Sequence, residues 1–133
     1  MAAMAQTATA PTPAASPELP LQASLQAEFA LQSGRLDEAA QAYLQAALAS
    51  GRDTRLSERA TRIAILANDR ALAQQALTLW QAQSPHAPGA RASAAALALR
   101  DGDVPAAQAL LAGLMQDPDP LAWRQALGAL INA

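Results

Sequence analysis

The feature that most constrains this chain is an internal repeat with a period of 34 residues. Apolar-Ala-apolar triplets recur at that interval, as Phe29-Ala30-Leu31, Ile63-Ala64-Ile65 and Leu97-Ala98-Leu99. The same offset links three further columns, which are Gly34, Asn68 and Gly102, then Ala39, Ala73 and Ala107, then Tyr43, Leu77 and Leu111. A fixed period of about 20–50 residues is the signature of stacked supersecondary units, none of which buries its apolar face alone. The sequence therefore predicts three copies of one unit, covering residues 20–53, 54–87 and 88–121.

Each unit is predicted to consist of two helices. In the first unit, apolar periodicity indicates a helix from about Leu21 to Ser33, which Gly34 ends because glycine adopts the left-handed conformation without a Cβ clash. Asp37 is predicted to cap a second helix that runs to about Ser50. Similar caps, first-turn prolines and breaks follow at Asp53, Asn68-Asp69, Ser84-Pro85, Pro88, Gly102-Asp103 and Asp117-Pro118. After Asp119-Pro120 a seventh helix is expected from Leu121 to about Asn132, which forms the terminal segment 122–133.

Composition favours the same fold class and narrows the function. Of 133 residues, 38 are Ala and 20 are Leu, whereas Val and Ile are scarce, so helices are favoured over strands. The absence of Cys excludes disulfides, thiolate metal sites and Cys nucleophiles, and a single His excludes multi-His metal sites. A formal net charge of −2 gives no electrostatic footprint for nucleic acid, and no apolar run reaches the roughly 18 residues of a membrane-spanning helix. We therefore expect an all-α chain with no cofactor, no metal and no small-molecule substrate.

The repeat resembles that of the tetratricopeptide repeat (TPR) family. The residues that fit the family pattern are Ala27, Ala39, Tyr43 and Ala46 in the first unit, Ala73 and Pro85 in the second, and Ala95, Gly102 and Ala107 in the third. Trp80 and Leu114 depart from the pattern, because they stand where a small residue is usual. The resemblance implies a right-handed superhelix of helix-turn-helix repeats, with about three TPR units and a terminal helix. Small residues would let helices cross closely, and larger side chains are expected to fill the gaps between hairpins, namely Phe29, Tyr43, Trp80 and Trp123.

The most informative polar feature is a charged cluster in the first helix of the second unit, formed by Arg55, Glu58, Arg59 and Arg62. Helical spacing places its three arginines on one face, and in stacks that resemble TPRs this helix lines the concave groove. One interpretation is a solvated face held by Glu58–Arg62 and Arg55–Glu58 pairs. The other is a patch that, together with Glu28, receives carboxylates of a partner peptide or helix, since Arg binds carboxylates in bidentate geometry. The sequence leaves both interpretations open.

The terminal helix carries a row of large apolar residues, and no polar capping helix follows it in the sequence. Terminal repeats normally present a polar outer face, and exposed apolar surface commonly marks an interface. Three explanations are open: the helix is itself a poor cap, the chain is the amino-terminal part of a longer array, or a partner covers the helix. If that partner is a second copy of the chain, the interface would include Trp123, Leu127 and Ile131.

Other candidate sites are weaker. His86 lies in a predicted loop between units, and no orienting carboxylate or nucleophile is visible for it in the sequence. The pairs Asp101/Asp103 and Asp117/Asp119 look like calcium ligands, but the remaining oxygens of an EF-hand loop are missing, and helix capping explains two of the four. No residue is therefore assigned a catalytic or metal-binding role.

Residues 1–19 form a Pro/Ala-rich segment without apolar periodicity, and we interpret them as a disordered N-terminal tether. Within it, Ala3-Met4-Ala5 has the small-x-small form of a signal-peptidase site, which favours export. The run Glu58–Ala64, followed by Leu79-Trp80, is similar to the first repeats of proteobacterial outer-membrane adaptor lipoproteins, which deliver substrates to a periplasmic processing protease. That similarity implies a bacterial periplasmic or envelope-associated protein, with a cytoplasmic location as the alternative.

The sequence as a whole predicts a non-enzymatic protein–protein interaction scaffold or adaptor that binds a partner peptide or helix in a concave groove. One alternative is a structural module that forms a homo-oligomer through the terminal helix. Another is the N-terminal part of a longer TPR array involved in envelope protein assembly or proteolysis. An enzyme is disfavoured, because no acid, base, nucleophile or metal constellation is visible.

Overall fold

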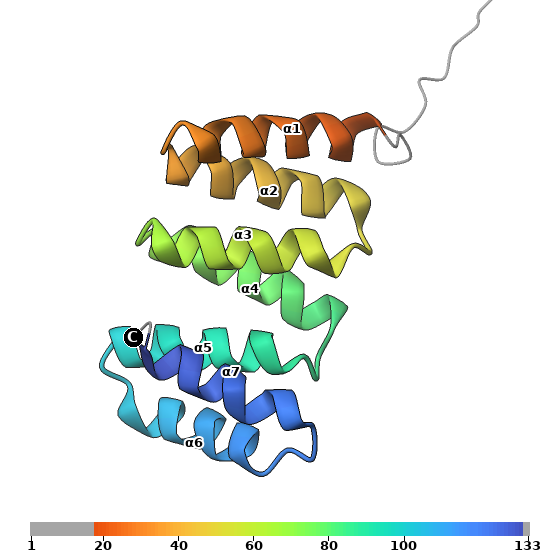
Figure 1. Ribbon diagram of the computed structural model, residues 1–133. Helices are drawn as coiled ribbons and strands as arrows, with labels where there is room; N and C mark the ends of the chain where they lie inside the picture. The colour runs from red at the N-terminus through yellow and green to blue at the C-terminus, as the bar shows by residue number, and fades with distance from the viewer. Residues whose placement is uncertain (1–17, 132–133) are drawn as a thin grey trace, which may run out of the picture.

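The computed structural model describes residues 18–131, with side chains described from Pro20 onward. This part of the chain consists of helices joined by short loops and contains no strand (Figure 1). Its helices are α1 (Glu18–Gln32), α2 (Leu36–Ser50), α3 (Thr54–Leu66), α4 (Arg70–Gln83), α5 (Pro88–Arg100), α6 (Val104–Met115) and α7 (Pro120–Ile131). The all-α prediction is confirmed for these residues.

The first helix begins earlier than the sequence predicted, at Glu18 rather than near Leu21. Pro20 does not prevent this start, because the N–H that proline lacks has no intrahelical partner in a first turn. The rest of the predicted tether, including Ala3-Met4-Ala5, lies outside the described residues. At the other end, the described part of α7 stops at Ile131, so Asn132 also lies outside it.

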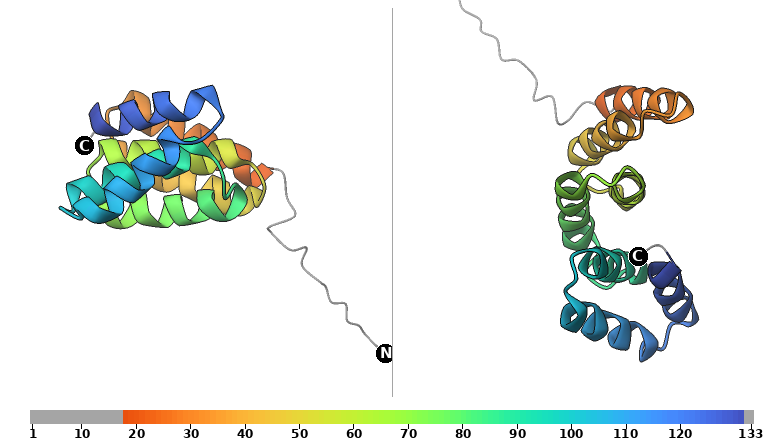
Figure 2. Two further views of the ribbon diagram at one scale, coloured as in Figure 1. Left: turned by 90° about the horizontal axis from the view of Figure 1, so that it is seen from below. Right: turned by 90° about the vertical axis from the view of Figure 1, so that its left-hand side faces the viewer.

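Neighbouring helices pack in chain order, first α1 on α2, then α2 on α3 and α3 on α4. In one view α2, α4 and α6 follow one side of the stack, while α1, α3 and α7 lie toward the other (Figure 2). The last helix differs from the rest, because α7 packs against α5 more extensively than against its chain neighbour α6. The architecture is repeat-like, with three helix pairs and one further helix.

The turns inside the three helix pairs have the same structure and the same 34-residue spacing. In each turn one residue has a positive φ, of 76° at Gly34, 58° at Asn68 and 76° at Gly102. Its N–H donates to the carbonyl three residues earlier, and the next N–H donates to the carbonyl five residues earlier. This pair of bonds is the Schellman motif, which satisfies carbonyls left without partners at a helix end. The sequence repeat is therefore also a repeat of backbone conformation.

Aspartate caps begin three of the helices as predicted. The carboxylates of Asp53, Asp69 and Asp103 accept hydrogen bonds from the backbone N–H of Arg55, Leu72 and Ala106, at 3.0, 3.1 and 3.2 Å. Asp119 also accepts a bond from the N–H of Leu121, at the start of α7. The cap predicted at Asp37 is wrong, because α2 begins at Leu36, with Arg35 in the cap position and no side-chain bond. The turn that closes α1 is short, so Asp37 falls in the first turn of α2.

Two apolar cores divide the stack, and α5 belongs to both. The larger core unites α1 to α4 with Ala90 and Leu97 of α5. The smaller core joins α5, α6 and α7 through six alanines and Leu114. Between consecutive helices inside the stack, packing is sparsest where α4 meets α5. One large side chain makes up for this at the joint, because Trp80 of α4 is only 3% exposed.

Trp80 fits at this joint because a glycine faces it. A Cβ atom on Gly89, in the first turn of α5, would lie 2.8 Å from Cη2 and 3.1 Å from Cζ2 of the Trp80 ring. Real Cβ atoms essentially never approach a ring carbon that closely. Gly89 thus explains how a tryptophan occupies a position where the repeat pattern has a small residue.

The expectation that large side chains fill the gaps between hairpins is correct for two residues and wrong for two. Tyr43 and Trp80 are buried, whereas Phe29 and Trp123 are 66% and 44% exposed. The exposed pair lies on helices that pack through alanines on another face, as α1 does through Ala27. No helix in the described part of the chain combines the length and apolarity needed to cross a membrane.

Candidate functional site

The three arginines of the charged cluster follow one face of α3, but each has a different environment. Arg59 lies at the centre, where its Nη2 contacts Oε2 of Glu28 on α1 at 2.9 Å. Its guanidinium carbon also lies 5.1 Å from the centroid of the Tyr43 ring on α2. A cation over an aromatic face at this distance is attracted by the ring quadrupole. Glu28 and Arg59, which the sequence placed in one site, are thus brought together as a link between three helices.

Arg55 stands at the start of α3 and pairs with the residue that caps the helix. Its Nε lies 3.2 Å from Oδ1 of Asp53, while its side chain is 88% exposed. The side-chain hydrogen bond from Arg55 is the main reason that the pKa of Asp53 lies below its usual value. The predicted Arg55–Glu58 pair is therefore replaced by an Arg55–Asp53 pair, because the capping carboxylate is fixed beside Arg55.

Arg62 is the least firmly paired of the three. Its Nη2 lies 3.9 Å from Oε1 of Glu58, so the predicted Glu58–Arg62 pair forms at the outer limit of an ion pair. About half of the Arg62 side chain is exposed. The same guanidinium lies 3.4 Å from the position that a Cβ on Gly89 would take, so it reaches from α3 toward the first turn of α5.

Arg62 borders a cavity of about 310 Å³ between α3, α5 and α7. The wall from α5 is made largely of small residues, which are Gly89, Ala92, Ser93 and Ala96, while α7 contributes Gln125, Gly128 and Ala129. A second cation, Arg100, stands at the end of α5 and donates from Nη1 to the carbonyl of Ile65 at 2.9 Å. None of the described residues that line the cavity is acidic. The cavity therefore has an apolar wall and a positively charged edge.

Sequence reasoning found Arg62 but missed the part of this site that comes from α5 and α7. A signal was present in α5, where Gly89, Ala92, Ala96 and Arg100 recur at intervals of three and four residues and so share one helical face. A face of small residues leaves space beside it. Nothing in the sequence indicated that α7 would lie across this face, because its partner helix is decided by packing.

The candidate interface on α7 is exposed, as its description as unpaired apolar surface requires. Trp123, Leu127 and Ile131 are 44%, 47% and 83% exposed, and Leu130 lies beside them on the helix surface. The buried face of α7 consists of Ala122, Ala126 and Ala129. The helix thus packs through small side chains and leaves its large apolar side chains outside.

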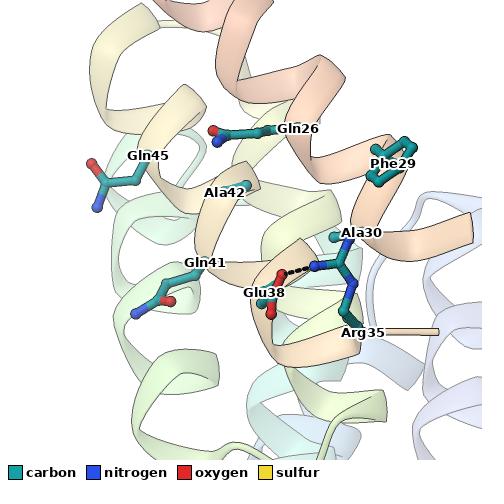
Figure 3. Close-up of a pocket in the computed structure, with 8 residues that line it drawn as sticks. All are labelled: Gln26, Phe29, Ala30, Arg35, Glu38, Gln41, Ala42 and Gln45. Atoms are coloured by element: carbon teal, nitrogen blue, oxygen red, sulfur yellow. Dashed lines mark hydrogen bonds and ion pairs between the residues drawn. The ribbon is translucent and has the colours of Figure 1, made fainter. Parts of the chain in front are cut away.

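A second depression, of about 570 Å³, lies between α1 and α2 (Figure 3). Its polar side chains include Gln26, Gln41 and Gln45, and the Arg35–Glu38 pair spans it at 2.6 Å. The Arg35 guanidinium lies 5.8 Å from the centroid of the exposed Phe29 ring. Because Arg35 and Glu38 neutralise each other, this depression has no excess charge of the kind found at the cavity edge.

Carboxylates elsewhere are engaged in contacts between helices or loops. Asp101 pairs with Arg70 and Asp117 pairs with Arg91. The pKa of Asp117 is lowered, first by the hydrogen bond from the Asp119 N–H and then by Arg91. His86 is exposed in the loop between α4 and α5. In residues 18–131 no group of three or more His, Cys, Asp or Glu side chains is placed to hold a metal ion.

No protein-family model, no curated protein and no solved structure matches this chain.

Proposed function

We propose that this chain is a non-enzymatic protein–protein interaction scaffold that binds a peptide or helix of a partner along α3 and in the cavity beside it. The observation that carries the proposal is that cavity of about 310 Å³, with Arg62 and Arg100 among its lining residues. An apolar concavity with a few charged groups at defined positions is the usual form of a binding site. Arg62 also belongs to the arginine row of α3, so a partner seated in the cavity would meet that row as well.

The proposal takes the fold as a right-handed TPR-like superhelix in which α1, α3 and α5 line the concave side. Support comes from the shared 34-residue register of the residue columns and from the three equivalent left-handed turns. The arrangement of α2 and α4 on the opposite side agrees with it (Figure 2). A crystal structure of the full chain tests the handedness through the rotation from each helix pair to the next.

Partner capture tests the binding proposal. The tagged full chain is incubated with extracts of its host, crosslinked, and its partners are identified by mass spectrometry. Arg62→Glu reverses the charge at the cavity edge, and Arg52→Glu makes the same change in the exposed loop between α2 and α3. We expect a partner that the parent chain and Arg52→Glu hold and that Arg62→Glu loses. Identical partners for all three proteins would contradict the proposal. Arg59 is left intact, because its loss would break the contact with Glu28.

A second candidate function is self-association through α7, which the exposure of Trp123, Leu127 and Ile131 favours. Sedimentation velocity over a concentration series measures it. Trp123→Gln with Leu127→Gln should abolish association, whereas Val104→Gln with Met115→Gln, which also replaces two exposed apolar residues, should leave it intact. A chain that is monomeric at every concentration would exclude this candidate.

A location in the periplasm or envelope, and a role beside a longer TPR array in protein assembly or proteolysis, rest on the resemblance of the α3 and α4 sequences to adaptor lipoproteins. Fractionation of host cells that produce the tagged protein from its own gene tests the location. Recovery in the cytoplasmic fraction would reject the envelope role and leave the binding proposal standing.

A further inference from the structure

The cavity between α3, α5 and α7 has the size of a pocket for one side chain. Its volume of about 310 Å³ lies near the lower end of the roughly 300–1,000 Å³ typical of ligand pockets. Apolar groups from all three helices line it, among them Ile65, Leu66, Ala92, Ala96 and Ala129. A bulky apolar side chain would gain from leaving water here, whereas a polar one would lose hydrogen bonds to water that these groups cannot replace.

The edge of the pocket carries more positive than negative charge. Arg62 approaches Glu58 only to 3.9 Å, compared with 2.9 Å between Arg59 and Glu28. An exposed pair of that kind contributes little, so a carboxylate arriving from outside can take the place of Glu58 at small cost. Arg100 adds a second positive charge, whose position is fixed by its bond to the Ile65 carbonyl. Guanidinium groups bind carboxylates through two parallel N–H···O bonds, which makes a carboxylate the complementary group.

We propose that this pocket selects a partner segment in which a bulky apolar side chain stands close to an Asp or Glu. The apolar side chain enters the pocket, and the side-chain carboxylate pairs with Arg62 at its edge. This inference rests on the proposed function and specifies the chemistry of the segment that is bound.

A polypeptide fits this surface better than a small apolar anion. Arg62 belongs both to the pocket edge and to the row of arginines on α3, so a chain anchored in the pocket continues over Arg59 and Arg55. A small anion would contact the pocket alone. Further acidic residues in the bound segment would then find Arg55, whose side chain is 88% exposed.

Selection from a peptide library tests the proposal even though the partner is unidentified. A displayed library of random dodecapeptides is panned on the immobilised full chain, and enriched peptides are synthesised with acetylated and amidated ends. We expect enrichment of Leu, Phe or Met within four positions of Asp or Glu. In the synthetic peptides, replacing the apolar residue by Ala should raise Kd about tenfold or more, and Glu→Gln about fivefold. Isotope-labelled chain should show its largest amide shifts at Gly89 and Gly128, which line the pocket, rather than at Gly34 or Gly51.

Two matched glycine variants separate the pocket from the surface around it. Gly128→Leu extends a side chain from α7 into the pocket, and Gly113→Leu makes the same change on α6, outside it. A Cβ at either position meets no atom within 4 Å, so both proteins should fold. Gly128→Leu should weaken peptide binding about tenfold or more, and Gly113→Leu should leave it unchanged. With Arg62→Gln, the difference in Kd between the Glu and Gln peptides should disappear.

Each result decides between the proposals. No enrichment, enrichment without an apolar–acidic pair, or binding that survives Gly128→Leu would overturn the inference. If Arg62→Glu still loses a cellular partner that Gly128→Leu retains, the scaffold function stands and only the pocket chemistry is wrong. Sodium decanoate serves as the small apolar anion. Should it compete with the peptides and produce the same shifts at Gly89 and Gly128 at lower concentration, the pocket is a site for apolar anions and the peptide inference fails.

Discussion

The joint between α4 and α5 gives the sharpest stability prediction, because a single absent methyl group determines it. Gly89→Ala places a Cβ 2.8 Å from Cη2 and 3.1 Å from Cζ2 of Trp80. The ring has little freedom to retreat, since Trp80 is 3% exposed and forms part of the larger core. The backbone of α5 must therefore move, and it moves at the point where consecutive helices have the fewest contacts.

The size of the effect follows from two opposing contributions. Overpacking a closely packed site costs typically about 1–3 kcal/mol. The gain from replacing Gly by Ala in a helix is about 0.5–1 kcal/mol. The net loss for Gly89→Ala should therefore be about 1–2 kcal/mol in the free energy of unfolding. For a urea m-value of about 1–3 kcal/mol/M, the midpoint should fall by roughly 0.5–1 M.

Urea unfolding, followed both by far-ultraviolet circular dichroism and by tryptophan fluorescence, measures this change. The two probes must coincide for a two-state analysis to hold. Gly113→Ala is the matched control, because a Cβ there meets nothing within 4 Å, so this variant should gain about 0.5–1 kcal/mol. In a Trp80→Phe background, where the ring carbons that clash are absent, Gly89→Ala should cost clearly less. Equal costs in both backgrounds, or a Gly89→Ala protein as stable as the parent, would refute the packing argument.

Three further changes have definite expected outcomes. Arg59→Gln removes a partly exposed ion pair with Glu28, so the free energy of unfolding, measured in urea, should fall by no more than about 1 kcal/mol. Gly102→Ala places a Cβ at a φ of 76°, which should cost about 1–2 kcal/mol in the same measurement. Asp117 has a lowered pKa in the folded chain, so its contribution is complete above the unfolded value of about 4 and is lost as the pH falls through the folded value. Asp117→Asn should therefore lower the urea midpoint at pH 7, and the two midpoints should converge below about pH 3; a constant difference would contradict this.

Most of the fold could be predicted from the sequence, because its signals are local and repeated. A Gly or Asn every 34 residues marks three left-handed turns, and each turn requires a residue that tolerates positive φ. The cap of α2 shows how far the repeat could have been used. Counting 34 residues back from Asp69 leads to Arg35, the residue that does stand in the cap position, whereas local preference for an acidic cap pointed to Asp37.

The candidate site was less predictable, because it depends on contacts between distant segments. Arg59 was identified by its spacing, but its engagement with Glu28 and Tyr43 depends on how α1 and α2 meet α3. Exposure of Phe29 likewise depends on which face of α1 turns toward α2, and periodicity alone gave no way to choose between an alanine face and an aromatic one. The pocket needed α7 to lie across α5, a non-local contact that no motif announces.

The division into two cores has a consequence for the proposed binding site. The α3 wall of the pocket belongs to the larger core, while Ala92, Ala96 and Ala129 belong to the smaller one. The two cores meet through α5, and at the start of α5 the contact between Trp80 and Gly89 holds them in register. A change at that contact should therefore alter the distance between the pocket walls without removing any group that touches the ligand. Gly89→Ala, assayed below its unfolding transition, should weaken the selected peptides, whereas Gly102→Ala should leave their Kd unchanged although it also destabilises the chain. If both variants bind as the parent does, the pocket is a property of α5 and α7 alone, and the joint has no part in recognition.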